Sequence, residues 1–153
     1  MTREANEPGA CVFCEATRRA NSLALVVHQG VEAFVILNLY PYNSGHLLVV
    51  PRRHVAALAG LSPSELSELA TLTQTAERVL TEAYAPQGIN VGMNLGRPAG
   101  AGVASHLHIH LVPRWTGDTS FMSVVGEVRV LPEELPQTVE RLRPIFARLA
   151  AGI

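Results

Sequence analysis

The most informative segment of this 153-residue chain is Ser105-His106-Leu107-His108-Ile109-His110-Leu111-Val112-Pro113, which holds three of its six histidines. Histidine alternates there with leucine and isoleucine, which is the period of two that is typical of a β-strand. We therefore expect the three imidazoles to share one face of a strand whose other face packs on a core. At about 3.3 Å of rise per residue, the first and third histidines of such a strand lie on the order of 13 Å apart.

This separation limits what the three histidines can do together. A zinc–imidazole bond is about 2 Å long, so a single metal ion cannot easily bind all three. Two neighbours could share a zinc ion, but at least one histidine must then have another role. Phosphoryl chemistry offers one, because a neutral imidazole nitrogen can attack phosphorus and form a covalent phosphoramidate. The alternative is a surface strand in which the histidines alternate by chance.

A glycine-rich loop, residues 96–102, leads into the histidine segment. Glycine allows backbone conformations in which N–H groups approach a phosphate closely, and such donors stabilise charge on its oxygens. The loop therefore either serves phosphoryl chemistry at the histidines or is an ordinary connection between two strands.

The two cysteines, Cys11 and Cys14, have the spacing that is common at structural zinc sites. One such pair supplies only half of a tetrahedral shell, so two more ligands are needed. The preferred candidates are His54, just after a predicted strand, and one member of the histidine segment. His28 and His46 are weaker candidates. A thioredoxin-like redox pair is the competing interpretation, but it needs a preceding strand that the polar residues before Cys11 do not provide.

The rest of the chain predicts a sheet that is crossed by a long helix. Apolar and β-branched runs bounded by turn residues indicate strands at 23–28, 33–39, 46–50 and 89–95, with a further short strand at 124–130. The first two strands are expected to form an antiparallel hairpin. The stretch Ser62-Pro63-Ser64-Glu65 has the pattern of a capping box, and apolar residues then recur at helical spacing as far as Pro86.

A second helical pattern covers residues 135–150, where Pro136 and Pro144 predict a kink or a late start. We therefore expect a single α+β domain over residues 1–153. It should contain about five antiparallel strands, one long crossover helix, a C-terminal helix and a loose N-terminus at 1–10.

Composition narrows the classes of function. Hydrophobic residues make up 48% of the chain and charged residues 16%, and the formal net charge is -1. This balance gives no support for a broad electrostatic interaction with a nucleic-acid polymer or a membrane surface, so any phosphate should be bound locally. No apolar run approaches the length of a membrane span, and the first ten residues are too polar for a signal peptide. We expect a cytoplasmic protein.

Several segments resemble the histidine triad (HIT) family. His106-Leu107-His108-Ile109-His110-Leu111-Val112 is similar to its signature of three histidines, each followed by a hydrophobic residue. The likeness extends from residue 11 to about residue 122 and includes the stretches 38–47, 90–96 and 112–115. These stretches most resemble the branch that contains diadenosine tetraphosphate phosphorylases and dinucleoside polyphosphate hydrolases.

The resemblance implies a homodimeric, nucleotide-binding α+β domain that forms a covalent nucleotidyl-histidine on the α-phosphate of its substrate. His108 would be the nucleophile, and His110 would contact the phosphate or assist proton transfer. The implied nucleotide-binding residues are Asn38 at the ribose, Asn94 near the scissile bridge, His46, and the loop residues Ala101, Gly102 and Val103. Adenine dinucleoside polyphosphates are the expected substrates, and an adenosine phosphoramidase or a slow nucleotide sensor are the alternatives.

The zinc-containing members of the family imply a structural zinc site in this chain. Matched residue by residue, its ligands are Cys11, Cys14, His54 and His106. Gly102 and Val103 stand where many members carry a polar side chain, so only backbone donors are expected there. Water and inorganic phosphate both remain possible acceptors of the nucleotidyl group, and hydrolysis and phosphorolysis are therefore both open.

Overall fold

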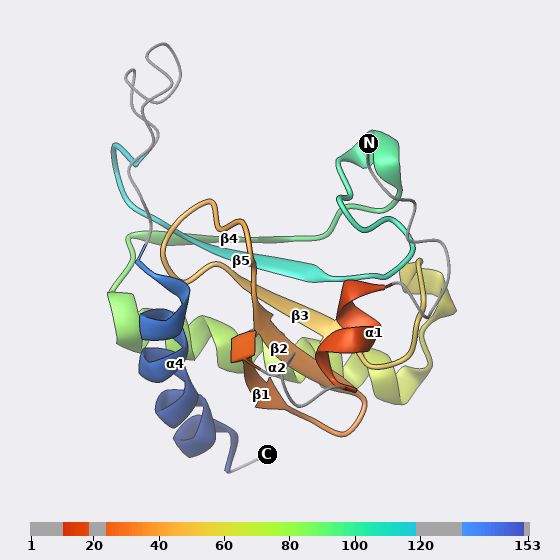
Figure 1. Cartoon of the computed structure of the whole chain (residues 1–153), viewed down its shortest axis with the longest axis horizontal. Coiled ribbons are helices and arrows are strands. Elements are labelled where there is room, and N and C mark those ends of the chain that lie inside the picture. Colours follow the sequence, from red (N-terminus) through yellow and green to blue (C-terminus); the bar gives the residue numbers. More distant parts are fainter. Residues whose placement is uncertain (1–10, 19–23, 119–132, 152–153) are drawn as a thin grey trace.

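The computed structural model describes residues 11–18, 24–118 and 133–151 of the chain. Within them, five strands form one antiparallel sheet in the order β1-β2-β3-β5-β4 (Figure 1). The strands are β1 Val26–Gln29, β2 Ala33–Leu37, β3 Leu47–Pro51, β4 Gly88–Gly92 and β5 Ile109–Arg114. The helices are α1 Val12–Ala16, α2 Pro63–Tyr84 and α4 Leu135–Ala150, with short 3-10 turns η2 Leu58–Gly60 and η3 Arg97–Ala99. The predicted α+β architecture, including the β1–β2 hairpin, is confirmed.

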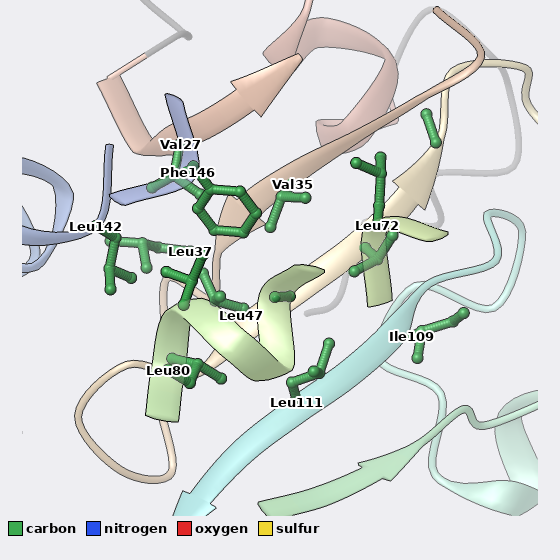
Figure 2. Close-up of a cluster of buried hydrophobic side chains, with 14 of the residues drawn as sticks. Val27, Val35, Leu37, Leu47, Leu72, Leu80, Ile109, Leu111, Leu142 and Phe146 are labelled. Carbon is green, nitrogen blue, oxygen red and sulfur yellow. The ribbon is translucent and has the colours of Figure 1, made fainter. Parts of the chain in front are cut away.

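One face of the sheet packs against α2 and α4. Figure 1 shows α2 running behind the strands, with α4 beside it. Figure 2 shows buried side chains of the strands meeting those of the two helices: Val27, Val35, Leu37, Leu47, Leu72, Leu80, Ile109, Leu111, Leu142 and Phe146. Because successive strand residues point to opposite faces, the same strands present their remaining side chains to the other side of the sheet.

The second face of the sheet carries α1. Its buried side chains form a separate cluster of Cys11, Phe13, Cys14, Ala16, Val26, Phe34, Ile36, Leu48 and Val50. His110 of β5 is paired in register with Leu48 of β3 and therefore shares this face. The two sides of the sheet thus have different roles, with the main core on one and the polar chemistry on the other.

The start of α2 is anchored as the sequence predicts. The Ser62 hydroxyl accepts from the N–H of Glu65 at 3.2 Å, and the Glu65 carboxylate accepts from the N–H of Ser62 at 2.7 Å. Both Glu65 carboxylate oxygens also lie 2.8 Å from the guanidinium of Arg53. Arg53 is the neighbour of His54, so the helix cap supports the segment that carries one predicted metal ligand.

The histidine strand begins later than predicted. β5 starts at Ile109, so His106 and His108 lie in the irregular segment before it. In the observed register Pro51 would pair with Leu107, but proline has no N–H to offer a ladder. The Leu107 N–H instead donates to the carbonyl of Val55 at 2.7 Å. The alternation nevertheless holds within β5, because Ile109 and Leu111 belong to the main core whereas His110 is on the opposite face.

Several other boundaries differ from the prediction. β1 begins at Val26 and β2 ends at Leu37. β4 ends at Gly92, which pairs with His110, because β5 offers almost no strand beyond that point. α4 covers the predicted range from Leu135 and does not start late: Pro136 lies in the first turn, where a missing N–H costs nothing, and Pro144, where a kink is predicted, lies within the helix. The predicted strand at 124–130 and the loose N-terminus at 1–10 lie outside the described residues. Among the helices in the described ranges, none is long and apolar enough to cross a membrane.

Replacing Ser62 with alanine should lower the free energy of unfolding by about 1 kcal/mol, because the Glu65 N–H loses its acceptor at the start of α2. Urea denaturation of Ser62→Ala and wild type measures this difference. Ser67→Ala is the matched control, because Ser67 is exposed within the same helix. It should change stability by less than about 0.5 kcal/mol. Equal losses in the two variants would contradict a capping role.

Candidate active site and metal cluster

Four potential metal ligands from three parts of the chain meet on the α1 side of the sheet. Cys11 and Cys14 belong to α1 and its N-cap, His54 follows β3, and His106 precedes β5. Their ligand atoms all lie within 4.8 Å of one another. His106 Nδ1 lies 3.3 Å from Cys11 Sγ and 3.6 Å from Cys14 Sγ, and His54 Nδ1 lies 3.3 Å from Cys14 Sγ. The predicted grouping of these residues is confirmed.

The spacing of these atoms suits a tetrahedral metal ion. Bonds of about 2.3 Å to sulfur and about 2.0 Å to nitrogen place such ligands about 3.5 Å apart, close to the observed separations. His106 Nε2 lies 2.8 Å from the carbonyl oxygen of Pro51. Because a carbonyl only accepts, Nε2 carries the ring proton, and the lone pair of Nδ1 is directed toward the two sulfurs. The donor set of two sulfurs and two imidazole nitrogens therefore fits zinc.

Two thiolates buried side by side are unfavourable unless a cation compensates their negative charges. Cys11 and Cys14 are both buried, and burial, followed by the neighbouring Cys11, raises the pKa of the Cys14 thiol. A divalent cation reverses this effect, because it stabilises the deprotonated form of each ligand.

A cavity of about 520 Å³ lies on the same side of the sheet as α1. It is lined by Val12, Phe13, Ala16, Leu25, Ile36, Leu37, Asn38, Leu39, Tyr40, Tyr42, Leu48, Gly100, Gly102, Val103, His108 and His110. A mostly apolar hollow with a few convergent polar groups is the usual form of a small-molecule site. α1 contributes to both places, because Val12, Phe13 and Ala16 line the cavity while Cys11 and Cys14 belong to the metal cluster.

His108 is buried in the cavity wall with one ring nitrogen already engaged. Its Nδ1 lies 2.9 Å from the carbonyl oxygen of His106, which can only accept. The proton is therefore on Nδ1, and Nε2 keeps a lone pair that is available to a ligand. Phe13 packs on this ring at 5.1 Å between centroids. Burial lowers the pKa of His108, so the ring stays neutral at pH 7.

His46 and His110 form a hydrogen-bonded pair of imidazoles. The N–H of Tyr42 donates to His46 Nδ1 at 3.1 Å, so His46 carries its proton on Nε2. His46 Nε2 lies 2.9 Å from His110 Nδ1 and donates to it. The proton of His110 is then on Nε2, and this ring lines the cavity beside His108, with 4.9 Å between the two centroids.

Only some of the other residues predicted for nucleotide binding line the cavity. Asn38, Gly102 and Val103 line the cavity, whereas His46, Asn94 and Ala101 are not among its lining residues. His46 is buried behind His110, and Asn94 donates from its amide to the carbonyl of Gly100 at 3.3 Å. The two weaker candidates for metal ligands, His28 and His46, lie outside the group of Cys11, Cys14, His54 and His106. His28 stacks on Phe146, and His46 pairs with His110.

Most of the apolar wall of the cavity was not predicted from the sequence. Phe13 lies between the two cysteines, and its ring contacts both His106 and His108. Tyr42 lines the cavity from the turn after β2 and packs on His46 at 4.6 Å between centroids. A clue was present in the sequence, since large side chains beside the cysteines and within a polar turn need a partner to cover them.

Comparison with known proteins identifies the family. Residues 19–117 match the family profile described as HIT domain. The chain belongs to the HIT family. An AP-4-A phosphorylase of Mycobacterium tuberculosis is 45% identical over 136 residues, which cover 89% of this HIT chain and 70% of that protein. An asymmetrical bis(5'-nucleosyl)-tetraphosphatase of Schizosaccharomyces pombe is 40% identical over 88 residues, which cover 58% of this chain and 47% of that protein. The predicted family and the predicted class, a nucleotide-processing HIT enzyme, are confirmed.

Solved structures of HIT proteins share the fold. A Zn-bound histidine triad family protein from Mycobacterium smegmatis superposes with a TM-score of 0.75 at 27% identity, covering 96% of this chain and all of that one. A hypothetical histidine triad nucleotide-binding protein from Sulfolobus tokodaii superposes with a TM-score of 0.71 at 27% identity, covering 93% of each chain. The HIT-like sheet and helices that the sequence predicted are therefore confirmed.

His46 should remain neutral well below pH 7. Burial, followed by the neighbouring His110 and His108, lowers its pKa from 6.5 to about 3. Because the pKa in the folded state is depressed, the contribution of this ring to stability is present above pH 6.5 and is lost as the pH falls toward 3. In an NMR titration, the Hε1 resonance of His46 should not move between about pH 8 and pH 5.

The His46→Gln variant assigns that resonance, and the same protein unfolded in urea is the control, in which the ring should titrate near its ordinary pKa. A midpoint for His46 near pH 6.5 in the folded protein would show that the ring is not sequestered behind His110.

Proposed function

We propose that this chain cleaves a phosphoanhydride bond of dinucleoside polyphosphates through a nucleotidyl intermediate on His108. The observation that carries the proposal is the 2.9 Å hydrogen bond between His108 Nδ1 and the carbonyl of His106. It leaves the lone pair of Nε2 on a ring that lines a mostly apolar cavity. A neutral imidazole nitrogen in such a position is a suitable nucleophile for phosphorus.

The relatives support the class of substrate. The AP-4-A phosphorylase and the asymmetrical bis(5'-nucleosyl)-tetraphosphatase are both named for dinucleoside tetraphosphates, and the first is similar over 89% of this chain. Diadenosine tetraphosphate is therefore the first compound to test. Its adenosine would occupy the apolar part of the cavity, and its α-phosphate would lie against the histidines.

Two displacements at the same phosphorus account for the reaction. In the first, His108 Nε2 attacks the α-phosphorus, a P–N bond forms, and the bond to the bridging oxygen breaks so that the remaining polyphosphate leaves with the electron pair. In the second, water or inorganic phosphate attacks that phosphorus, the P–N bond breaks, and its electron pair returns to Nε2. The attacking oxygen loses its proton to solvent. Hydrolysis and phosphorolysis differ only in this acceptor.

The remaining polar groups would bind and orient the substrate. His110 carries its proton on Nε2 and would donate it to a phosphate oxygen or to the leaving group. The backbone N–H groups of Gly102 and Val103 would supply further donors to the phosphate, since these residues line the cavity without polar side chains. Asn38 would hold the ribose hydroxyls. Asn94 would act near the scissile bridge, with its amide bonded to the loop at Gly100.

We further propose that Cys11, Cys14, His54 and His106 hold a structural zinc ion. When bound, the ion supplies the positive charge that two buried thiolates require, and it takes no part in the displacements. α1 has five residues, and the side chain of its N-cap residue does not cap the helix, so this helix is too short to be stable without tertiary anchors. Zinc would therefore hold Val12 and Phe13 in the cavity wall.

We also propose that the protein is a homodimer and is located in the cytoplasm. β4 is an edge strand that pairs with β5 alone among the strands described, and Val91 is 52% exposed on it. An exposed, partly apolar edge of this kind suits the addition of a second copy of the sheet.

Incubation of the protein with diadenosine tetraphosphate, with and without inorganic phosphate, tests the proposed function. Separation of the products should show AMP and ATP if water is the acceptor, and phosphate-dependent ADP and ATP if phosphate is the acceptor. His108→Ala should lower turnover by at least about a thousandfold, because it removes the nucleophile.

His28→Asn is the matched control for this assay, since His28 lies in contact with Phe146 on the other side of the sheet. It should retain the activity of the wild type. Full activity of His108→Ala would disprove the mechanism, and tight nucleotide binding without turnover by the wild type would favour a sensor.

Metal analysis of the purified protein should find about one zinc ion per chain. Cys14→Ser should lose most of that zinc, whereas His28→Asn should keep it. Because α1 lines the cavity, Cys14→Ser should also bind AMP more weakly by about tenfold, as measured by calorimetry. Zinc content that is unchanged in Cys14→Ser would show that the cluster does not bind the metal.

A further inference from the structure

The turn between β2 and β3 contacts the histidine pair but buries little apolar surface of its own. Its large side chains are mostly exposed, at 57% for Leu39, 78% for Tyr40 and 68% for Tyr42. A polar contact holds it instead. The Asn43 amide Nδ2 donates to the carbonyl of Pro113 at 3.0 Å and to the carboxylate of Asp118 at 2.9 Å.

Asp118 is itself fixed to the end of β5. Its two carboxylate oxygens lie 2.6 and 2.7 Å from Nε and a terminal nitrogen of Arg114, and one of them also accepts from the N–H of Trp115 at 3.2 Å. Charge-assisted bidentate contacts of this kind fix the plane of the carboxylate as well as its position. Asn43 therefore connects the turn to a rigid acceptor just beyond the end of β5.

The turn delivers one backbone N–H group to the His46 ring. The N–H of Tyr42 donates to His46 Nδ1, and His46 Nε2 donates in turn to His110 Nδ1. A neutral imidazole has one proton, so an acceptor role for one nitrogen places the proton on the other. The side-chain amide of Asn38 lies 3.4 Å from both nitrogens of His46 and therefore does not distinguish between the two tautomers. The Tyr42 N–H, at 3.1 Å from Nδ1, is the closer donor and selects one of them, and through His46 that of His110.

We propose that Asn43 and Asp118 act as a positioning clamp that fixes the tautomers of His46 and His110 by holding the Tyr42 N–H against His46. The consequence for the rate rests on the proposed function, whereas the tautomers themselves do not. When the turn is released, both rings can exchange tautomers. A His110 ring with its proton on Nδ1 has no donor to offer a phosphate in the cavity.

Asn43→Ala is the direct test, and Asn90→Ala is its matched control. Asn90 lines the same cavity of about 330 Å³ as Asn43 and Asp118, and its side-chain oxygen accepts from Arg114 at 3.0 Å. In the described part of the chain, no hydrogen bond joins the Asn90 side chain to the turn between β2 and β3. Long-range ¹H–¹⁵N spectra of the resting protein report ring tautomers directly. Wild type and Asn90→Ala should show the proton of His46 and His110 on Nε2, and Asn43→Ala should show a mixture of tautomers.

The kinetic readout distinguishes positioning from binding. In Asn43→Ala we expect kcat for diadenosine tetraphosphate to fall about tenfold and KM to change less than about twofold, because the lost donor acts at the phosphate in the transition state. Asp118→Asn should show the same effect more weakly, because it keeps an acceptor for Asn43 but weakens the pair with Arg114. It also serves as the test variant if circular dichroism shows that Asn43→Ala does not fold.

Unchanged tautomers in Asn43→Ala, or the same mixture in Asn90→Ala, would overturn the clamp. Failure of the wild type to cleave any dinucleoside polyphosphate would overturn the proposed function instead. The NMR comparison needs no substrate and would still decide whether the clamp exists.

Discussion

The site depends on the hydrogen bond from His106 Nε2 to the carbonyl of Pro51, at the point where the β3–β5 ladder ends. This carbonyl directs Nδ1 of His106 toward the cysteines. The carbonyl of His106 itself accepts from Nδ1 of His108 and leaves Nε2 available in the cavity. Two backbone carbonyls thus give two histidines of the same segment opposite available nitrogens, one beside the cysteines and one in the cavity.

α1 connects these two uses of the segment. Its cysteines face the metal cluster, and the ring of Phe13 contacts His106 at 5.5 Å and His108 at 5.1 Å between centroids. Since the same helix also lines the cavity, the metal ligands and the cavity wall cannot move independently. A structural ion bound by the two cysteines would therefore affect the shape of the cavity on the other side of this short helix.

Much of this arrangement could be predicted from the sequence, because it follows from local patterns. The period of two around His108 and the capping box at Ser62 are short-range features, and the four candidate metal ligands follow from the resemblance to the zinc-containing members of the family. The start of β5 could not be predicted, because it depends on which residue of β3 lies opposite Leu107. The part played by Asn43 was also inaccessible, because its partners Pro113 and Asp118 are 70 and 75 residues away along the chain.

The chemistry of the site is determined by the positions of protons rather than by net charge. Burial lowers the pKa of His46 to about 3 and that of His106 to about 4, and it also lowers the pKa values of His108 and His110. Neutral rings of this kind differ from one another only in their tautomers, which hydrogen bonds to the backbone select. A small shift of a carbonyl or an N–H group can therefore change which ring nitrogen carries the lone pair without changing any charge. The proposed clamp gives this sensitivity a structural counterpart: a turn with little buried apolar surface is held by Asn43 against Asp118, which follows β5 and is paired with Arg114 at the end of that strand.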